Sequence, residues 1–574
     1  MHFPVLPWMR AGALALLAVQ GCGPAAEATF GEESKLAQES TSEPDLSRSA
    51  PALPVTVTVN AAANQHPISP EIYGVASATP AQLADLNLPL HRSGGNHTSR
   101  YNWKLNAFNR ASDWYFESIP EASDVPGENG DTFIATSRGA GAQPMLTVPI
   151  LGWVAKLGLG RSKLASFSIG KYGAQTDRDW QWFADAGNGI RTSGQYVTGN
   201  DPADANTVST PALQREWVQH LVTQWGTASA GGLRYYILDN EPSLWHATHR
   251  DVHPTGATME EVRDRMLDYG AAVKAVDPGA LLVGPEEWGW SGYLYSGYDQ
   301  QYAQHNGYPP PSSLPDRAAH GGWDYLPWLL NQLRENSIGT GRRALDVLSV
   351  HYYPQGGEYS NNTTQAMQLL RNRSTRSLWD ASYVDESWIA TPVQLIPRLR
   401  GWVNAYYPGT RTAITEYNWG AEDNINGATA QADLLGIFGR EGLDMAVRWG
   451  TPASTTPTYK AIKLYRNYDG QRSTFGDVSV STTVPAPDTL SAFAALRSSD
   501  GALTIMVVCK SLSNGATLTL DMAGFAPGGP AQVWQLTSAN TLTRKADIPL
   551  SGMRLFASLP ATSVTLLVIP PLSH

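Results

Sequence analysis

Cysteine and charged residues are both scarce in this chain. Only Cys22 and Cys509 occur among 574 residues, and Asp, Glu, Lys and Arg together make up 16%. No basic run occurs, and 51 acidic against 41 basic residues give a net charge of −10. Because phosphate binding needs clustered Lys and Arg, this balance argues against nucleic acid as a partner. The chain also has no Gly-x-Ser-x-Gly elbow, phosphate-binding loop or Cys–His nucleophile pair.

The apolar run near the N-terminus, residues 11–19, is too short to span a bilayer. It ends in Val-Gln-Gly-Cys at 19–22, which resembles a bacterial lipobox. We interpret 1–21 as a lipoprotein signal peptide, Cys22 as the lipidated residue and 22–54 as a disordered tether. The expected location is the bacterial cell envelope, lipid-anchored and facing outward. The alternative is an ordinary secretory peptide in which Cys22 is incidental. If Cys22 is lipidated, it cannot form a disulfide with Cys509. Cys509 is then expected to be an inert buried thiol.

Alternating strand and helix patterns fill residues 70–470 and predict a (β/α)8 barrel with long loops. One helix is expected to begin at Thr210, with Pro211 in its first turn and Gly226 after its end. An eighth strand is not evident, and we place it within 160–200. A doubly wound sheet is the alternative, but no glycine-rich phosphate turn follows the first strand. The seven predicted strands are 88–92, 144–149, 235–239, 280–284, 347–351, 412–415 and 445–448.

The C-terminal part, residues 471–574, consists of short alternating runs and predicts an all-β sandwich domain. Residues 55–69 begin with an isolated alternating segment, Val-Thr-Val-Thr-Val, which we expect to join that sandwich. The chain would then close the sandwich from both ends.

Two glutamates follow predicted barrel strands at the end where catalytic groups gather. Glu241 ends the fourth strand, directly after Asn240, and Glu416 ends the seventh. Cutting a glycosidic bond needs one carboxyl that holds a proton and one that stays ionised. An amide such as Asn240 can hold the sugar 2-hydroxyl, a contact that strengthens in the transition state. The pair therefore predicts a retaining glycoside hydrolase.

At these residues the chain resembles glycoside hydrolase family 44. The resemblance implies endo-acting cleavage of β-1,4-glucan, often including xyloglucan, with Glu241 as acid/base and Glu416 as nucleophile. It implies no cofactor for the chemistry. It also implies a structural Ca²⁺, for which the sequence offers Asp177, Asp179, Asp185 and Asn188 as hard oxygen ligands. The matching stretches are RSGGN at 92–96, RYNW at 100–103, TGNDP at 198–202, 238–254, DRAAHGG at 316–322 and TEYNWG at 415–420.

Further side chains at strand ends are candidates for substrate contact, since flat aromatic rings suit the C–H face of a pyranose. His351 or Tyr353 could also hydrogen-bond Glu416 and keep it ionised, unless His351 is a satisfied core residue. His246, His249 and His253 have near metal-ligand spacing, but without a His-Glu-x-x-His pattern we favour loop architecture over zinc. The substrate-binding candidates are Asn96, Trp103, Trp153, Asn240, Trp245, Glu287, His351, Tyr353, Trp419 and Trp449.

The sequence thus predicts a monomeric endo-β-1,4-glucanase or xyloglucanase whose partner is a β-1,4-linked polysaccharide and whose only membrane contact is its lipid. Two alternatives stay open. The same mechanism could act on xylan or mannan, because loop geometry sets that choice. A non-catalytic surface glycan-binding lipoprotein would use the same aromatic residues without turnover.

Overall fold

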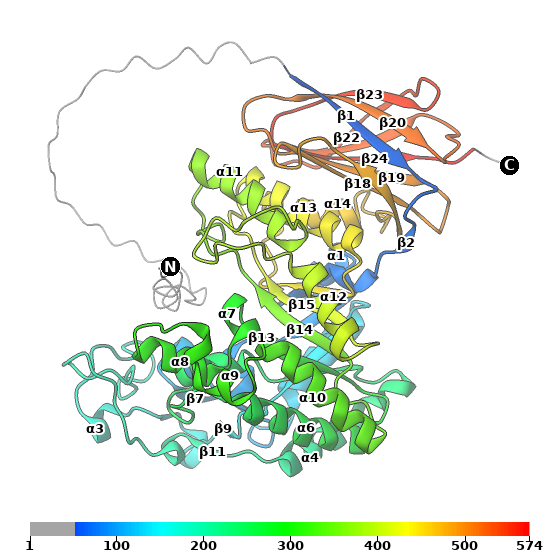
Figure 1. Ribbon diagram of the computed structural model, residues 1–574. Coiled ribbons are helices and arrows are strands. Elements are labelled where there is room, and N and C mark those ends of the chain that lie inside the picture. Colours follow the sequence, from blue (N-terminus) through cyan, green and yellow to red (C-terminus); the bar gives the residue numbers. More distant parts are fainter. Residues whose placement is uncertain (1–51, 573–574) are drawn as a thin grey trace, which may run out of the picture.

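A computed structural model describes residues 52–572 (Figure 1). Eight parallel strands close into a barrel, and a separate all-β sandwich packs beside it. The predicted fold class is therefore confirmed. Cys22 lies outside the described residues. The barrel strands, in chain order, are β3 (Gly74–Ala76), β4 (Leu90–Ser93), β8 (Gln143–Val148), β12 (Tyr235–Leu238), β13 (Leu281–Glu287), β14 (Val347–Tyr352), β15 (Arg411–Tyr417) and β16 (Met445–Arg448).

The strand missing from the sequence analysis is the first one, β3, and its predicted place within 160–200 is wrong. β3 has only three residues, too few to show an alternating pattern. It closes the barrel by pairing with β16 on one side and β4 on the other. The numbering of the later strands is unaffected, so β12 is the fourth strand and β15 the seventh.

Side chains of alternate strand residues fill two separate cores. Tyr235 and Ile237 of β12 point into the barrel with Met145 and Val283, whereas Tyr236 belongs to the core under the helices. This period of two is the normal consequence of the strand pleat. The packed interior makes the barrel a rigid support for the residues at its carboxyl end.

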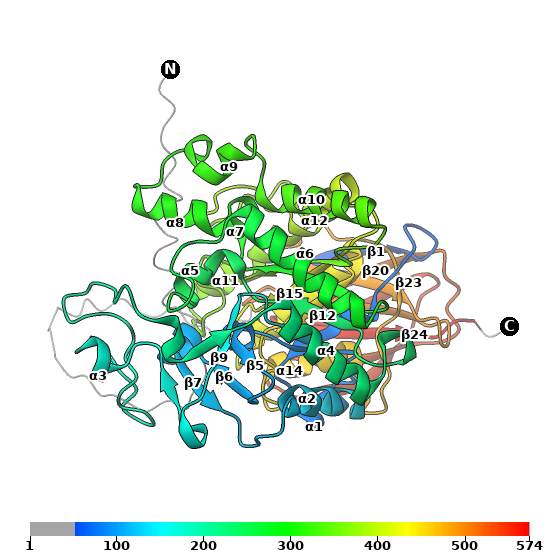
Figure 2. The same ribbon diagram turned by 90° about the horizontal axis from the view of Figure 1, so that it is seen from below.

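Helices cover the outside of the barrel (Figures 1 and 2). Helix α4 begins and ends as predicted: Thr210 accepts a hydrogen bond from the Leu213 amide, and Gly226, with φ of 84°, terminates it. The α-helices are α1 (Pro80–Asp85), α2 (Glu128–Gly139), α3 (Ile169–Tyr172), α4 (Pro211–Trp225), α5 (Trp245–Thr248), α6 (Met259–Val276), α7 (Trp290–Leu294), α8 (Gly297–His305), α9 (Pro315–Ala319), α10 (Tyr325–Thr340), α11 (Gln365–Ser374), α12 (Leu395–Tyr406), α13 (Ile425–Glu441) and α14 (Pro457–Arg466).

The long connections after β4 and β8 form short sheets beside the barrel. One contains β5 (Tyr101–Asn102), β6 (Ala107–Asn109), β7 (Glu117–Pro120) and β10 (Leu164–Ala165), and the other pairs β9 (Trp153–Ala155) with β11 (Asn206–Val208). The segment that carries α3 projects from this side of the molecule (Figure 2). Two 3₁₀ turns, η4 (Asn96–Arg100) and η5 (Ala111–Trp114), lie in the connection after β4.

The sandwich takes in the start of the described chain. β1 (Leu53–Asn60) runs parallel to β20 over its whole length and antiparallel to β17. The other strands of the sandwich are β2 (His66–Pro67), β17 (Val478–Thr483), β18 (Leu490–Leu496), β19 (Leu503–Cys509), β20 (Ala516–Ala523), β21 (Ala531–Leu536), β22 (Thr543–Ile548), β23 (Arg554–Leu559) and β24 (Ser563–Ile569).

Helix α13 links the two parts, because it packs against β18, β19 and β24 while it covers the barrel. Cys509, at the end of β19, is a free buried thiol, and burial raises its pKa. Within the described range, no helix has both the length and the apolar character needed to cross a membrane.

Candidate active site

The turn after β12 places Glu241 at the carboxyl end of the barrel in a strained backbone conformation. Asp239 and Glu241 have positive φ values of 68° and 45°. Buried Asp239 holds this turn, since its Oδ2 accepts hydrogen bonds from the amides of Ile150 (2.5 Å) and Leu151 (2.8 Å). The Glu241 amide donates to the carbonyl of Glu286. Strained residues persist only where the surroundings fix them, and such positions cluster at functional sites.

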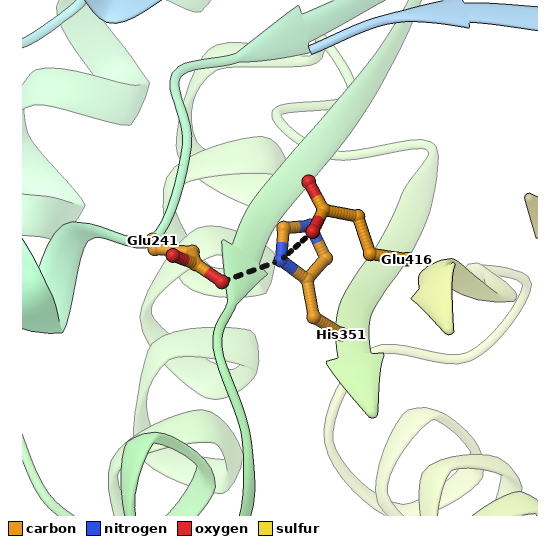
Figure 3. Close-up of side chains that lie close together, drawn as sticks. All are labelled: Glu241, His351 and Glu416. Atoms are coloured by element: carbon orange, nitrogen blue, oxygen red, sulfur yellow. Dashed lines mark hydrogen bonds and ion pairs between the residues drawn. The ribbon is translucent and has the colours of Figure 1, made fainter. Parts of the chain in front are cut away.

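Glu241 and Glu416 approach each other on either side of His351 (Figure 3). His351 Nδ1 lies 2.8 Å from Glu241 Oε1 and 3.5 Å from Glu416 Oε2. One carboxylate oxygen from each glutamate and one His351 nitrogen all lie within 4.8 Å of one another. Both glutamates are nearly buried, with side-chain exposures of 15% and 7%. Carboxyl groups of retaining glycosidases lie about 5–5.5 Å apart, and those of inverting enzymes about 6.5–9.5 Å. The arrangement has the short separation.

Arg92, at the end of β4, joins the two halves of this site. Its guanidinium donates to Glu416 Oε1 and to Glu286 Oε2, both at 2.7 Å, and to Asn240 Oδ1 at 3.1 Å. Tyr353 donates its hydroxyl proton to the second oxygen of Glu416 at 2.9 Å. Both oxygens of Glu416 are therefore oriented by a donor, one of them the charged guanidinium of Arg92, and charge-assisted hydrogen bonds are among the strongest in proteins.

The surroundings give the neighbouring titratable groups different proton affinities. Burial raises the pKa of Glu241, and the nearby Glu416 adds to this against the opposing effect of His351. Burial disfavours a charged His351, but Glu416, Glu241 and Glu286 outweigh it and raise its pKa to about 9. Burial would raise the pKa of Glu286, yet Arg92 and His351 hold it at about 2. Glu241 therefore holds its proton to a higher pH than an ordinary glutamate does, whereas Glu286 and His351 favour their charged forms at neutral pH.

Comparisons with known proteins identify the family. Residues 107–356 match the model of glycoside hydrolase family 44. Endoglucanase A of Paenibacillus lautus is 31% identical over 523 residues, which cover 87% of this chain and 70% of that protein. The chain belongs to glycoside hydrolase family 44. It is therefore a glycosidase, and its chemistry requires no cofactor.

Two solved structures resemble this family 44 enzyme over nearly all of its length. CelM2, a bifunctional glucanase-xylanase from a metagenome library, is 68% identical, with a TM-score of 0.89 and coverage of 91% of this chain and 100% of CelM2. A Paenibacillus polymyxa xyloglucanase of family 44, solved with xyloglucan, is 29% identical, with a TM-score of 0.74 and coverage of 90% and 99%.

The structure brings several of the predicted substrate-binding residues of the family 44 enzyme to Glu241 and Glu416. His351 and Tyr353 contact the glutamates directly. Asn240 donates to Asn96, and Asn96 donates in turn to Asp113. The guanidinium carbon of Arg92 lies over the indole of Trp449, 5.9 Å from the centre of that ring.

Four of the predicted tryptophans and the predicted Glu287 do not contact Glu241 or Glu416. Trp245 and Trp419 are interior residues: the indole of Trp245 donates to the Asn240 carbonyl and that of Trp419 to Ser374. Trp103 and Trp153 are half-buried against the outer core. Glu287 is fully buried below the site, where it accepts a hydrogen bond from Ser243 and where burial raises its pKa to about 8. Glu286, and not Glu287, bonds to the groups around Glu416.

The predicted metal ligands do not form a cluster. Asp185 bonds to Ser168 and the Gly170 amide, Asp177 accepts a bond from Tyr115, and Asn188 donates to Thr176. His246, His249 and His253 also form no three-ligand group in the described residues. His249 contacts Arg100, and His253 contacts Glu261. Over residues 52–572, three-ligand groups occur only at Glu241, His351 and Glu416 and at Glu260, Asp316 and His320.

Sequence reasoning missed Arg92 and Asp113 as members of the site, and of the two neighbours Glu286 and Glu287 it chose Glu287. Arg92 carried a usable signal, because it lies in a predicted barrel strand, 88–92, and a charged side chain that is buried there must be paired. Glu286 and Glu287 cannot be told apart by the period of two, since the ladder between β13 and β14 shifts its register between Pro285 and Glu287.

Replacing Arg92 with methionine is expected to destabilise the enzyme by about 3–5 kcal/mol at neutral pH, because two buried carboxylates lose their partner. The ionised Glu286 stabilises the fold above its ordinary pKa of 4.5, and this contribution is lost as the pH falls towards about 2. The penalty should therefore shrink below about pH 4.5. Urea unfolding at several pH values measures it. Arg373→Met, which breaks an exposed pair with Glu386, is the control and should cost about 0–1 kcal/mol.

Proposed function

We propose that this enzyme cleaves β-1,4-linked glucan chains internally with retention of anomeric configuration. The observation that carries the proposal is the approach of Glu241 and Glu416 oxygens to within 4.8 Å, in surroundings where burial raises the pKa of Glu241 and where Arg92 and Tyr353 donate to Glu416. This separation leaves no room for a water between carboxylate and sugar, so direct attack by one carboxylate is favoured.

In the first step, Glu416 attacks the anomeric carbon and Glu241 gives its proton to the leaving glycosidic oxygen. A glycosyl ester on Glu416 results, and the cleaved chain departs as an alcohol. In the second step, Glu241 removes a proton from water, the water oxygen bonds to the anomeric carbon, and Glu416 leaves as a carboxylate. Arg92 and Tyr353 hold the Glu416 oxygens throughout.

The substrate class follows from the relatives. Endoglucanase A, the glucanase-xylanase CelM2 and the xyloglucanase support a glucan backbone as the main substrate, with xylan as a second one. The high identity to CelM2 over its whole length favours activity on both backbones. We propose that mannan is a poorer substrate, since its axial 2-hydroxyl meets the Asn240 amide in a different direction.

Release of reducing ends tests the function. The purified enzyme should release them from xyloglucan, mixed-linkage glucan and xylan, and the viscosity of the polymer should fall early, as internal cleavage requires. Proton NMR during the first minutes should show the β-anomer of the new reducing end. An α-anomer as first product would rule out retention, and exclusive release of monosaccharide would rule out internal cleavage.

We also infer that Cys22 carries a lipid and that the enzyme is held, as a monomer, on the outward face of the cell envelope. The lipobox at 19–22 and the polar segment 23–54 support this inference. Cys22→Ala should move the enzyme from the membrane fraction to the soluble fraction, and an unchanged membrane fraction would contradict the anchor.

We infer a structural calcium ion at Glu117 and Asp179, and thus at only one of the four residues named from the sequence. Both carboxylate oxygens of Glu117 are buried without a hydrogen-bond partner. Burial, reinforced by the adjoining Asp179, raises the pKa of Glu117 to about 8. A divalent cation between two buried carboxylates would relieve this repulsion, and oxygen ligands suit calcium. The ion would tie β7 to the loop after α3.

Calcium is therefore expected to stabilise the protein by about 1–3 kcal/mol at a saturating concentration. A melting curve with calcium, compared with one in EDTA, measures the effect, and Glu117→Gln should abolish it. Asp185→Asn is the matched control, because Asp185 holds Ser168 and Gly170 elsewhere in the same loop, and it should keep the calcium response. The same calcium shift in Glu117→Gln would disprove the site.

A further inference from the structure

Large aromatic side chains are exposed in the segment between β10 and β11. Trp180 is 77% and Trp182 60% exposed, whereas most tryptophans of the described chain are buried or half-buried. Exposing two indoles in one short loop is unfavourable in water unless the surface has a partner. The loop belongs to the projecting part of the molecule near α3 (Figure 2).

The two indoles stand on an ordered base. Asp179 Oδ1 accepts hydrogen bonds from the amides of Gln181 (2.8 Å) and Trp182 (3.1 Å), which fixes the turn that carries both indoles. Trp182 packs against Trp114 of η5 with ring centres 5.0 Å apart, and the Trp114 indole donates to Asp179. We call Trp114, Trp180 and Trp182 the aromatic platform.

The platform is continuous with the catalytic residues. Asp113, the neighbour of Trp114, accepts a hydrogen bond of 3.0 Å from Asn96. Asn96 in turn accepts one of 3.2 Å from Asn240, which precedes Glu241. η5 also packs against η4 and α5, the elements that follow β4 and β12. Two hydrogen bonds, the peptide links of Asn240 to Glu241 and of Asp113 to Trp114, and the packing of Trp114 on Trp182 therefore connect the catalytic residues to the platform.

We propose that the aromatic platform binds the β-1,4-linked polysaccharide chain at some distance from the cleaved bond. This inference rests on the proposed function and extends it. The flat indole faces offer apolar area to the C–H faces of successive pyranose rings. The charges beside them are of both signs: Lys163 Nζ lies 5.9 Å from the Trp182 ring centre, and Asp177, Arg178 and Asp179 directly precede Trp180, so no single sign of charge marks this surface for a charged partner. A long chain held here is presented to Glu241 and Glu416 at higher local concentration, whereas a short substrate gains nothing.

The test compares long and short substrates. The double variant Trp180→Ala/Trp182→Ala should lower kcat/KM on xyloglucan and carboxymethyl cellulose by about tenfold, mainly through KM, as the loss of stacking contacts predicts. Its kcat/KM on an aryl cellobioside should stay within about twofold of wild type. Cello-oligosaccharides of increasing length should show wild type gaining over the variant only beyond a threshold length.

Phe556→Ala is the matched control, because Phe556 is 56% exposed on the sandwich strand β23. It should leave both rates unchanged. Equal polymer kinetics in wild type and double variant, or an equal loss in Phe556→Ala, would overturn the platform. A change of oligomeric state in gel filtration without a change in polymer kinetics would also overturn it, since it would assign the surface to a second copy. Wild-type turnover of the aryl substrate tests the proposed function separately.

Discussion

Glu416→Ala is expected to abolish turnover of every substrate, with kcat falling by about 10⁴-fold or more, as loss of a covalent nucleophile does in other enzymes. Arg92 and Tyr353 keep their places but have no carboxylate to orient. Initial rates on an aryl cellobioside and on xyloglucan measure the loss. Folding should be preserved, because the buried Arg92 guanidinium keeps Glu286 and Asn240 as partners.

Added azide should restore part of this activity, because a small anion can occupy the space that the carboxylate leaves. The product should be a glycosyl azide of inverted anomer, formed in one displacement from the face that Glu416 occupies in wild type. Glu386→Ala, which removes an exposed carboxylate paired with Arg373, is the control and should retain full activity. Near-wild-type rates for Glu416→Ala without azide would refute its role as nucleophile.

That Glu241 and Glu416 lie on one face of the barrel is predictable from sequence, because it depends on strand ends alone. In a parallel barrel all carboxyl ends meet on one face, so glutamates after the fourth and seventh strands must share that face. The numbers of the strands from β12 onward were right although β3 was misplaced, because its predicted place within 160–200 and its actual place both precede β12. The sandwich strands with strong alternation, such as β20, are visible for the same local reason, whereas the mostly exposed and polar β22 is not.

The hydrogen-bond partners of Glu241 and Glu416 were not predictable, because they come from residues far apart in the sequence. Arg92 lies 324 positions from Glu416, and His351 lies 110 from Glu241. Whether a tryptophan lies at the surface is equally a property of packing: Trp245 and Trp419 follow strand ends as sugar-binding residues do, yet their indoles face inward to Asn240 and Ser374. Local pattern gives position along a strand but not the direction of the side chain beyond its end.

Glu241→Gln should separate substrates by the quality of their leaving group. On xyloglucan, where the departing oxygen needs a proton, kcat/KM is expected to fall by about 10²–10⁴-fold, the usual contribution of a general acid. On a dinitrophenyl cellobioside the leaving group departs unprotonated, so the first step should be nearly unaffected and the glycosyl-enzyme should accumulate as a burst. Equal losses on both substrates would exclude Glu241 as the acid.

The pH profile of the same variant identifies the group that carries the proton. In wild type, burial raises the pKa of Glu241, so the acid form persists to higher pH and activity on polymer is lost as the pH rises through that pKa. Glu241→Gln should therefore lose the alkaline limb when its residual polymer activity is followed. Glu287→Gln is the matched control: Glu287 is also buried, with a pKa raised to about 8, but it contacts Ser243 rather than His351. If removing Glu287 abolished the limb and removing Glu241 did not, the proton donor would have to be reassigned to the deeper carboxyl.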